Sequence, residues 1–155
     1  MGIEIERKFL IKEMPADLSC YKSNYLTQAY LNTSPVVRIR KEDDSYYLTY
    51  KGGGLLAREE YNLPLNEASF YHLLEKADGN IISKTRYKIP YLQNNKSYTI
   101  ELDIFDAPFT PLVIAEVEFS CEEDANQFIP PDWFGKDVTF DKQYHNSNMS
   151  QRSLY

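Results

Sequence analysis

Alternation of apolar and charged residues with a period of two is the dominant pattern of this chain. Seven separate stretches show it. Because successive side chains of a β-strand point to opposite faces, each stretch predicts a strand with one apolar and one charged face. The stretches are 3–9, 37–40, 48–51, 58–63, 84–89, 100–104 and 115–119. A further strand is predicted over 25–31, and together these strands require a fold dominated by one antiparallel sheet.

The segments between the predicted strands are short and rich in turn residues, which favours an antiparallel meander. Helices are expected to be few. The stretch 66–79 carries an apolar stripe, with Gly79 placed as its C-cap. A capping box formed by Ser120 and Glu123 predicts a second, short helix. The polar tail from Tyr144 onward is a third helix candidate.

Length and composition place this chain among globular proteins. We expect one domain over 1–155, since 155 residues can build one hydrophobic core. There is no apolar run of membrane-spanning length, and the charged N-terminus does not resemble a signal peptide. Cys20 and Cys121 lack zinc-finger spacing, so we expect a reduced, cytoplasmic protein. We expect it to be a monomer or a homodimer. The net charge of −6 argues against a nucleic-acid partner.

The charged faces are sorted by sign. Residues two apart on a strand lie on one face, about 7 Å apart, and crowding like charges there costs free energy unless something of opposite sign is held between them. A single charged strand face is usually only a solvated surface, but five like-charged pairs are not explained that way. The acidic pairs are Glu4/Glu6, Glu101/Asp103 and Glu116/Glu118, and the basic pairs are Arg38/Arg40 and Lys84/Arg86.

Facing acidic pairs can hold a hard divalent cation through carboxylate oxygens. Basic pairs can hold a chain of phosphates. No histidine or cysteine belongs to any pair, so Mg²⁺ or Mn²⁺ is favoured over zinc. His72 and His145 are interpreted as surface or packing residues. If both signs face inward, the sheet closes into a small barrel with apolar side chains outside, and its interior can house one ligand.

The opening segment Glu4-Ile-Glu6-Arg-Lys8 resembles the N-terminal ExExK signature of the triphosphate tunnel metalloenzymes, the CYTH superfamily. The resemblance continues in order along nearly the whole chain and is closest to the small, single-domain bacterial triphosphatase branch. The matching segments are VRIR (37–40), LTYK (48–51), REEY (58–61), SKTRY (83–87), IELDIF (100–105), AEVEF (115–119) and VTFDKQYHNSNM (138–149).

This resemblance implies a mainly β (α+β) fold: a closed, eight-stranded antiparallel barrel with a charged interior and a few flanking helices. By similarity, the metal ligands are Glu4, Glu6, Glu116 and Glu118, and the phosphate-binding residues are Lys8, Arg38, Arg40, Lys51, Lys84 and Arg86. Glu60 and Asp103 match acidic positions of the barrel interior, and Glu101 lies beside them. The chain departs from the family pattern at Asn62, where many members carry a second glutamate.

The implied activity is hydrolysis of a triphosphate, with inorganic tripolyphosphate cleaved to diphosphate and phosphate. The catalytic set is then Glu4, Glu6, Glu60 and Glu118, and the proton from the attacking water goes either to a metal-binding glutamate or to Glu60. Alternative enzymes are a thiamine triphosphatase, a nucleoside triphosphatase and a class IV-type adenylate cyclase. The non-enzymatic alternative is a polyphosphate-binding module.

Overall fold

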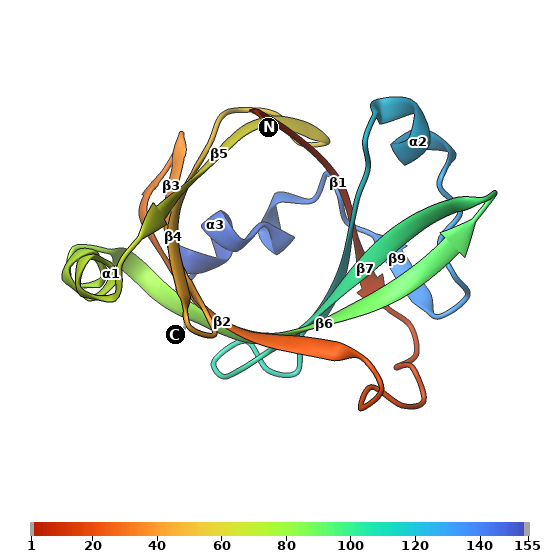
Figure 1. Ribbon diagram of the computed structural model, residues 1–155, viewed down its shortest axis with the longest axis horizontal. Coiled ribbons are helices and arrows are strands. Elements are labelled where there is room, and N and C mark those ends of the chain that lie inside the picture. Colours follow the sequence, from red (N-terminus) through yellow and green to blue (C-terminus); the bar gives the residue numbers. More distant parts are fainter. Residues whose placement is uncertain (1, 154–155) are drawn as a thin grey trace.

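Antiparallel β-strands that close into a barrel make up most of the computed structural model, which describes residues 2–153 (Figure 1). The strand order is β5-β4-β3-β2-β6-β7-β8-β1-β9, and an additional pairing of β5 with β1 closes the ring. Strands β1 to β8 form the barrel, and β9 pairs with the end of β1 outside it. The predicted eight-stranded antiparallel barrel is confirmed, with one extra short strand.

The strands are longer than the patterns from which they were predicted. Their bounds are β1 Gly2–Ile11, β2 Lys22–Thr33, β3 Val36–Glu42, β4 Ser45–Lys51, β5 Ala57–Leu65, β6 Asp78–Gln93, β7 Lys96–Phe105, β8 Val113–Glu118 and β9 Phe134–Asp137. The helices are α1 Glu67–Leu74, α2 Glu122–Gln127 and α3 Asn146–Ser150, and a 3₁₀ turn spans Lys142–Tyr144. No helix in the described part of the chain is both long and apolar enough to cross a bilayer.

The barrel carries its hydrophobic core on the outside of the sheet. Outward-facing side chains of β7 and β8, including Leu102 and Val117, pack with Phe9 and with Phe128, which follows α2. On the opposite side, α1 places Phe70 against β2 and β3. These outer layers bury the apolar face of the alternation, and the charged face is left for the interior.

The C-terminal segment closes one end of the barrel. In Figure 1, α3 is seen across the barrel opening, and it packs on β2 and β6. Met149 of α3 is fully buried in an apolar cluster with inward-facing residues that include Ile82, Phe105 and Ile114. This apolar plug fills the end of the barrel next to α3. The polar interior lies on the other side of the plug and is open at the opposite end of the barrel.

Two helix boundaries differ from the sequence prediction. Helix α1 ends at Leu74, and Gly79 is not its C-cap but the second residue of β6. Gly79 has φ +74°, and a Cβ there would overlap the carbonyl oxygen of Ser150, so glycine permits the close approach of the C-terminal segment. The N-cap of α2 is Cys121 instead of Ser120. Cys121 and Cys20 are both exposed free thiols.

Arg7 points away from the barrel interior and fastens α2 to the barrel wall. Its guanidinium donates to the carbonyl oxygens of Ala125 (2.8 Å) and Phe128 (3.0 Å) and pairs with Asp137 (2.9 Å).

We therefore expect Arg7→Ala to lower the free energy of unfolding by about 1–3 kcal/mol, because two part-buried carbonyl acceptors lose their donor. Urea denaturation measures this loss. Catalysis by the folded protein is expected to be unchanged, and a loss of kcat without a loss of stability would contradict the assignment.

Candidate functional site

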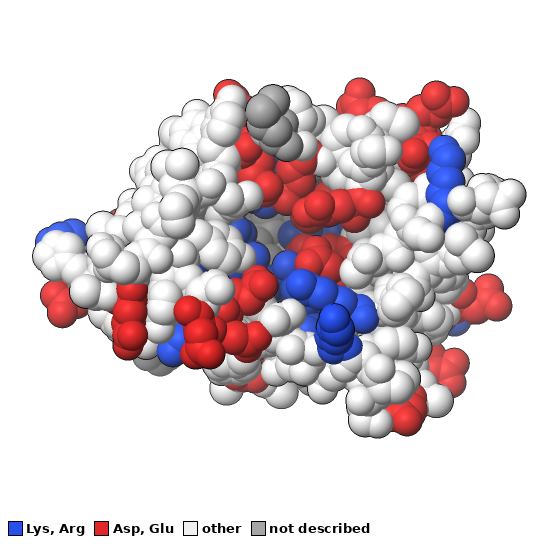
Figure 2. Space-filling model, viewed as in Figure 1, with Lys and Arg blue, Asp and Glu red and all other residues white. Residues whose placement is uncertain are grey.

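A cavity of about 400 Å³ occupies the barrel interior. It opens in the middle of the face shown in Figure 2, where acidic and basic side chains surround the hollow. The charged residues that line it are Glu4, Glu6, Lys8, Arg38, Arg40, Glu42, Lys51, Arg58, Glu60, Lys84, Arg86, Lys88, Glu101, Glu116 and Glu118. All the predicted metal ligands and phosphate-binding residues are in this set. Asp103 does not line the cavity, because it is fully buried beneath Lys84 and Arg86.

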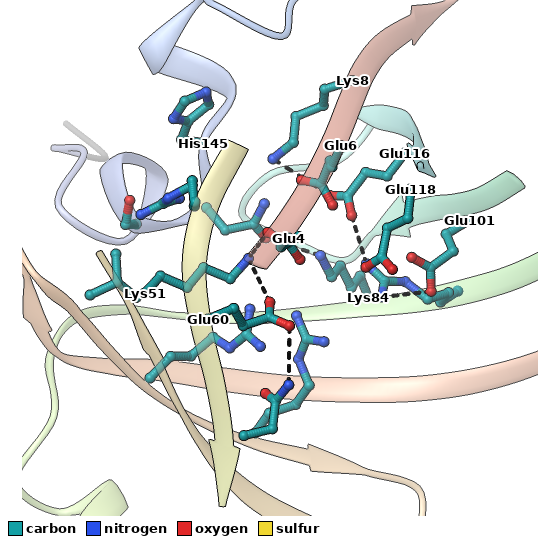
Figure 3. A pocket seen from close by; sticks show the side chains of 18 of the residues that line it. Glu4, Glu6, Lys8, Lys51, Glu60, Lys84, Glu101, Glu116, Glu118 and His145 are labelled. Carbon is teal, nitrogen blue, oxygen red and sulfur yellow. Dashed lines mark hydrogen bonds and ion pairs between the residues drawn. The ribbon is translucent and has the colours of Figure 1, made fainter. Parts of the chain in front are cut away.

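Strand pairing brings three carboxylates into one cluster. Glu4 and Glu6 share a face of β1, and the pairing of β1 with β8 sets Glu118 opposite Glu6. Carboxylate oxygens of these three residues lie within 4.8 Å of one another (Figure 3). We call them the carboxylate cluster. Glu116, the fourth predicted metal ligand, instead contacts Lys8 (3.5 Å) and Arg86 (3.2 Å).

The carboxylate cluster cannot easily carry three negative charges by itself. Partial burial and the surrounding glutamates, Glu4 first among them, raise the pKa of Glu118 to about 7. Burial, together with Glu116 and Glu4, raises the pKa of Glu6 well above its usual range. Burial also opposes ionisation of Glu4, but the Lys51 ammonium at 2.7 Å and a hydrogen bond with Glu60 together outweigh it and lower the Glu4 pKa to about 2. A cation held by these oxygens would relieve the repulsion, and an all-oxygen donor set suits Mg²⁺ or Mn²⁺.

Four of the basic residues are neutralised by carboxylates. Lys84 and Arg86 both bind Asp103, at 2.7 Å each, and Arg86 also contacts Glu101 at 3.1 Å. Lys51 binds Glu4 and lies 3.5 Å from Glu60, while Lys8 pairs with Glu116. Burial still dominates for Lys84, and it lowers the pKa of that ammonium to about 8 despite Asp103.

Arg38 and Arg40 differ from the other cations because their partners are uncharged. Arg38 donates from Nη2 to Thr49 Oγ1 (3.1 Å), and its buried Nε has no hydrogen-bond partner. Arg40 donates from Nε (2.8 Å) and Nη2 (2.6 Å) to Gln28 Oε1. Within residues 2–153, neither guanidinium forms an ion pair, although each is only 7% exposed. Burial and the neighbouring Arg38 lower the pKa of Arg40. Two buried, unneutralised arginines suit an anion with several oxygens.

Asn62, where the family pattern has a glutamate, links Arg38 to the acidic side of the cavity. Asn62 Oδ1 accepts a hydrogen bond from Thr49 (2.5 Å), and its Nδ2 donates to Glu60 Oε1 (3.1 Å). Thr49 in turn accepts from Arg38. The amide thus orients Glu60 without adding a further negative charge.

Several uncharged residues of the site could not be predicted from the sequence. Gln28, Tyr47, Thr49 and Asn146 contact the cations, but single polar residues have no periodic signature. His145, predicted to be a surface or packing residue, is half-buried and lines the cavity. Its Nε2 lies 3.0 Å from the carbonyl oxygen of Thr139, and burial lowers its pKa. It is not part of the carboxylate cluster.

Comparison with known proteins shows the family to which this chain belongs. An inorganic triphosphatase from Nitrosomonas europaea is 39% identical over 153 residues, covering 95% of this chain and 96% of that protein. An inorganic triphosphatase from Acetivibrio thermocellus is 38% identical over 156 residues, covering 96% and 94%. The crystal structure of an inorganic triphosphatase superposes with a TM-score of 0.71 at 35% identity, covering 99% of this chain and 97% of that one. The model of the CYTH domain matches residues 2–153, and this chain therefore belongs to the CYTH domain family.

Proposed function

We propose that this protein hydrolyses inorganic tripolyphosphate to diphosphate and phosphate with the help of Mg²⁺ or Mn²⁺. The observation that carries the proposal is the separation of charge inside one cavity. Glu6 and Glu118 of the carboxylate cluster form no ion pair among the described residues, and neither do Arg38 and Arg40. A triphosphate with its divalent cation supplies the opposite charge to both groups. The similarity to two proteins named inorganic triphosphatases supports this substrate.

The carboxylate cluster would hold the cation, since its oxygens are close together and repel one another without it. A bound divalent cation would supply positive charge at the phosphate oxygens and lower the pKa of a coordinated water. Glu116 belongs to the predicted ligand set, but here it neutralises Lys8 and Arg86. We infer that this ion pairing also keeps those two cations directed into the cavity.

The basic residues would bind the phosphate chain and stabilise the charge that develops during phosphoryl transfer. Arg38 and Arg40 offer full positive charges, and Lys8, Lys51, Lys84 and Arg86 offer charges shared with carboxylates. Preorganised donors of this kind are the main catalytic device available for a phosphate leaving group.

Glu60 is the group that we propose to accept the proton of the attacking water. It lines the cavity but lies outside the carboxylate cluster, so it is free of the role of holding the cation. Burial and its contact with Glu4 raise its pKa, which makes it a stronger base than an ordinary carboxylate. Asn62 fixes its orientation.

Tripolyphosphate is expected to be hydrolysed with a kcat/KM about tenfold or more above that for ATP. The cavity lining is dominated by charged side chains that recognise phosphates, whereas selection of an organic group needs dedicated hydrogen bonds or a stacking pocket. Steady-state kinetics with tripolyphosphate, ATP and thiamine triphosphate, at the same metal concentration, measure the ratio. A preference for ATP or thiamine triphosphate would contradict the substrate, and formation of cyclic AMP would indicate a cyclase. Tripolyphosphate binding without phosphate release would indicate a binding module.

A further inference from the structure

The C-terminal segment contributes a buried amide to the interior of the barrel. Asn146 is the first residue of α3 and is 8% exposed. Its Oδ1 accepts hydrogen bonds from Lys84 Nζ (3.0 Å) and from Gln28 Nε2 (2.9 Å). Gln28 is fully buried on β2, and its Oε1 accepts both bonds from Arg40. An unbroken chain of hydrogen bonds therefore runs from Lys84 through Asn146 and Gln28 to Arg40, joining four segments of the protein.

The direction of these hydrogen bonds explains why Gln28 is an amide. Lys84 and Arg40 can only donate, so the chain needs an acceptor at each end. Gln28 must present its oxygen to Arg40 and its nitrogen to Asn146, which only a neutral amide can do. A carboxylate at position 28 would accept from Arg40, but it would neutralise the guanidinium and have no proton to donate to Asn146.

The amide chain restrains Arg40 without neutralising it. Lys84, the other cation of the chain, is also paired with Asp103. A long basic side chain has many rotamers, and ordering it when an anion binds costs roughly 0.5–1.5 kcal/mol. Gln28 holds Arg40 by two of its nitrogens, which orients the planar guanidinium before any anion arrives. Its charge is left for the ligand, unlike that of Arg86, which is shared with Asp103 and Glu101.

The segment that carries Asn146 is itself well anchored. Met149 is buried in the apolar plug, and Asn80 of β6 donates to the carbonyl oxygens of Met149 (3.1 Å) and Arg152 (2.8 Å). Gly79 allows the backbone at Ser150 to approach β6 closely. The C-terminal segment is thus attached to β6 on both sides of the buried Met149.

We propose that Gln28 and Asn146 are positioning residues, which make the C-terminal segment part of the phosphate-binding site by aligning Arg40 and Lys84. This inference rests on the proposed function, because it assumes that those two cations bind phosphates. It assigns a role to two uncharged residues that act through the cations they contact.

Neutral substitutions test the alignment. The variants are Gln28→Met, Asn146→Ala and the double variant, with Asn148→Ala, an exposed position of α3, as the control. Tripolyphosphate affinity is measured by calorimetric titration in EDTA. With Mg²⁺ it is measured under initial-rate conditions, and Tm is recorded for each protein. We expect each single variant to bind about 5- to 30-fold more weakly, since one or two hydrogen bonds to a cation are lost. The double variant should be no more than about twofold weaker than the worse single variant, because both residues act through one chain.

Charged substitutions separate positioning from a merely structural role. Asn146→Asp keeps an acceptor oxygen for Lys84 and Gln28, so its Tm should match or exceed that of the wild type. Its added charge competes with the ligand for Lys84, so tripolyphosphate affinity should fall by about tenfold or more. Asn148→Asp adds the same charge outside the cavity and should leave affinity unchanged. This pair also keeps the test decisive if Gln28→Met fails to fold.

The inference is overturned if Asn146→Ala and Asn146→Asp bind tripolyphosphate like the wild type, or if the effects of the two neutral substitutions multiply. The proposed function stands in either case, provided the wild type hydrolyses tripolyphosphate. Wild-type protein that binds tripolyphosphate without hydrolysing it would overturn the proposed function and leave this test intact. Wild-type protein that binds it neither with EDTA nor with Mg²⁺ would overturn both.

Discussion

Replacing Glu118 with glutamine is expected to abolish turnover and, at the same time, to stabilise the metal-free protein. Turnover is lost because the carboxylate cluster loses one of the three carboxylates that would hold the cation. Stability rises because the folded state no longer confines three repelling carboxylates. Since solvent screens this partly exposed site, we expect an increase in Tm of about 2–4 °C, equivalent to about 1 kcal/mol. Glu6→Gln should have the same two effects.

The stabilisation should depend on pH in a defined direction. The pKa of Glu118 is raised from 4.5 to about 7, so the folded protein binds more protons than the unfolded chain between these values. Stability of the wild type therefore falls as pH rises through this window. The gain in Tm from Glu118→Gln should be full at about pH 8 and smaller at about pH 5. Thermal denaturation in EDTA at both pH values measures it.

Glu59→Gln is the matched control for this prediction. Glu59 is a neighbouring carboxylate on β5, but it is exposed and accepts a hydrogen bond from Tyr61 on the outer face of the barrel. It should change neither turnover nor the pH dependence of Tm. Near-wild-type turnover in both Glu6→Gln and Glu118→Gln would refute the assignment of the carboxylate cluster as the cation site.

Replacing Arg40 with alanine is expected to lower kcat/KM for tripolyphosphate by about 30- to 1000-fold, equivalent to about 2–4 kcal/mol of transition-state stabilisation. Arg40 is a buried cation that no carboxylate neutralises among the described residues, so its whole charge is available to the substrate. Steady-state kinetics with a fixed excess of metal measure the loss.

Lys41→Ala controls for the loss of a positive charge on the same strand. Lys41 follows Arg40 directly but faces outward, where its ammonium donates to the hydroxyl of Tyr71. Its replacement should change kcat/KM by less than about twofold. If Lys41→Ala or Arg7→Ala impaired catalysis as strongly as Arg40→Ala, the division of residues between the inner and outer faces would be wrong.

The barrel and the membership of its charged lining could be predicted because a strand has a strict period of two. Once Glu4 is placed inside, Glu6 and Lys8 must follow, and Arg7 must point outward, as the structure shows. The sorting of charge by strand then indicated that the charged faces enclose a ligand. Both predictions depend only on residues that lie close together in the sequence.

The pairing within the cavity could not be predicted, because it depends on register between distant strands. Glu116 and Glu118 have the same pattern in the sequence, yet one lies between Lys8 and Arg86 and the other joins the carboxylate cluster. The role of Asn146 is even harder to predict from the sequence. It meets Gln28 across 118 positions of sequence, and neither amide belongs to one of the charged pairs.

Phosphate release from tripolyphosphate in the presence and absence of divalent metal is the decisive measurement of metal-dependent hydrolysis by this protein. The protein is first treated with EDTA and desalted, and release is then followed without metal, with Mg²⁺ and with Mn²⁺, using Glu118→Gln as the inactive reference. We expect release of one phosphate per tripolyphosphate that depends on added metal and is absent from the variant. Equal release from the metal-free protein, or equal release by Glu118→Gln, would contradict it.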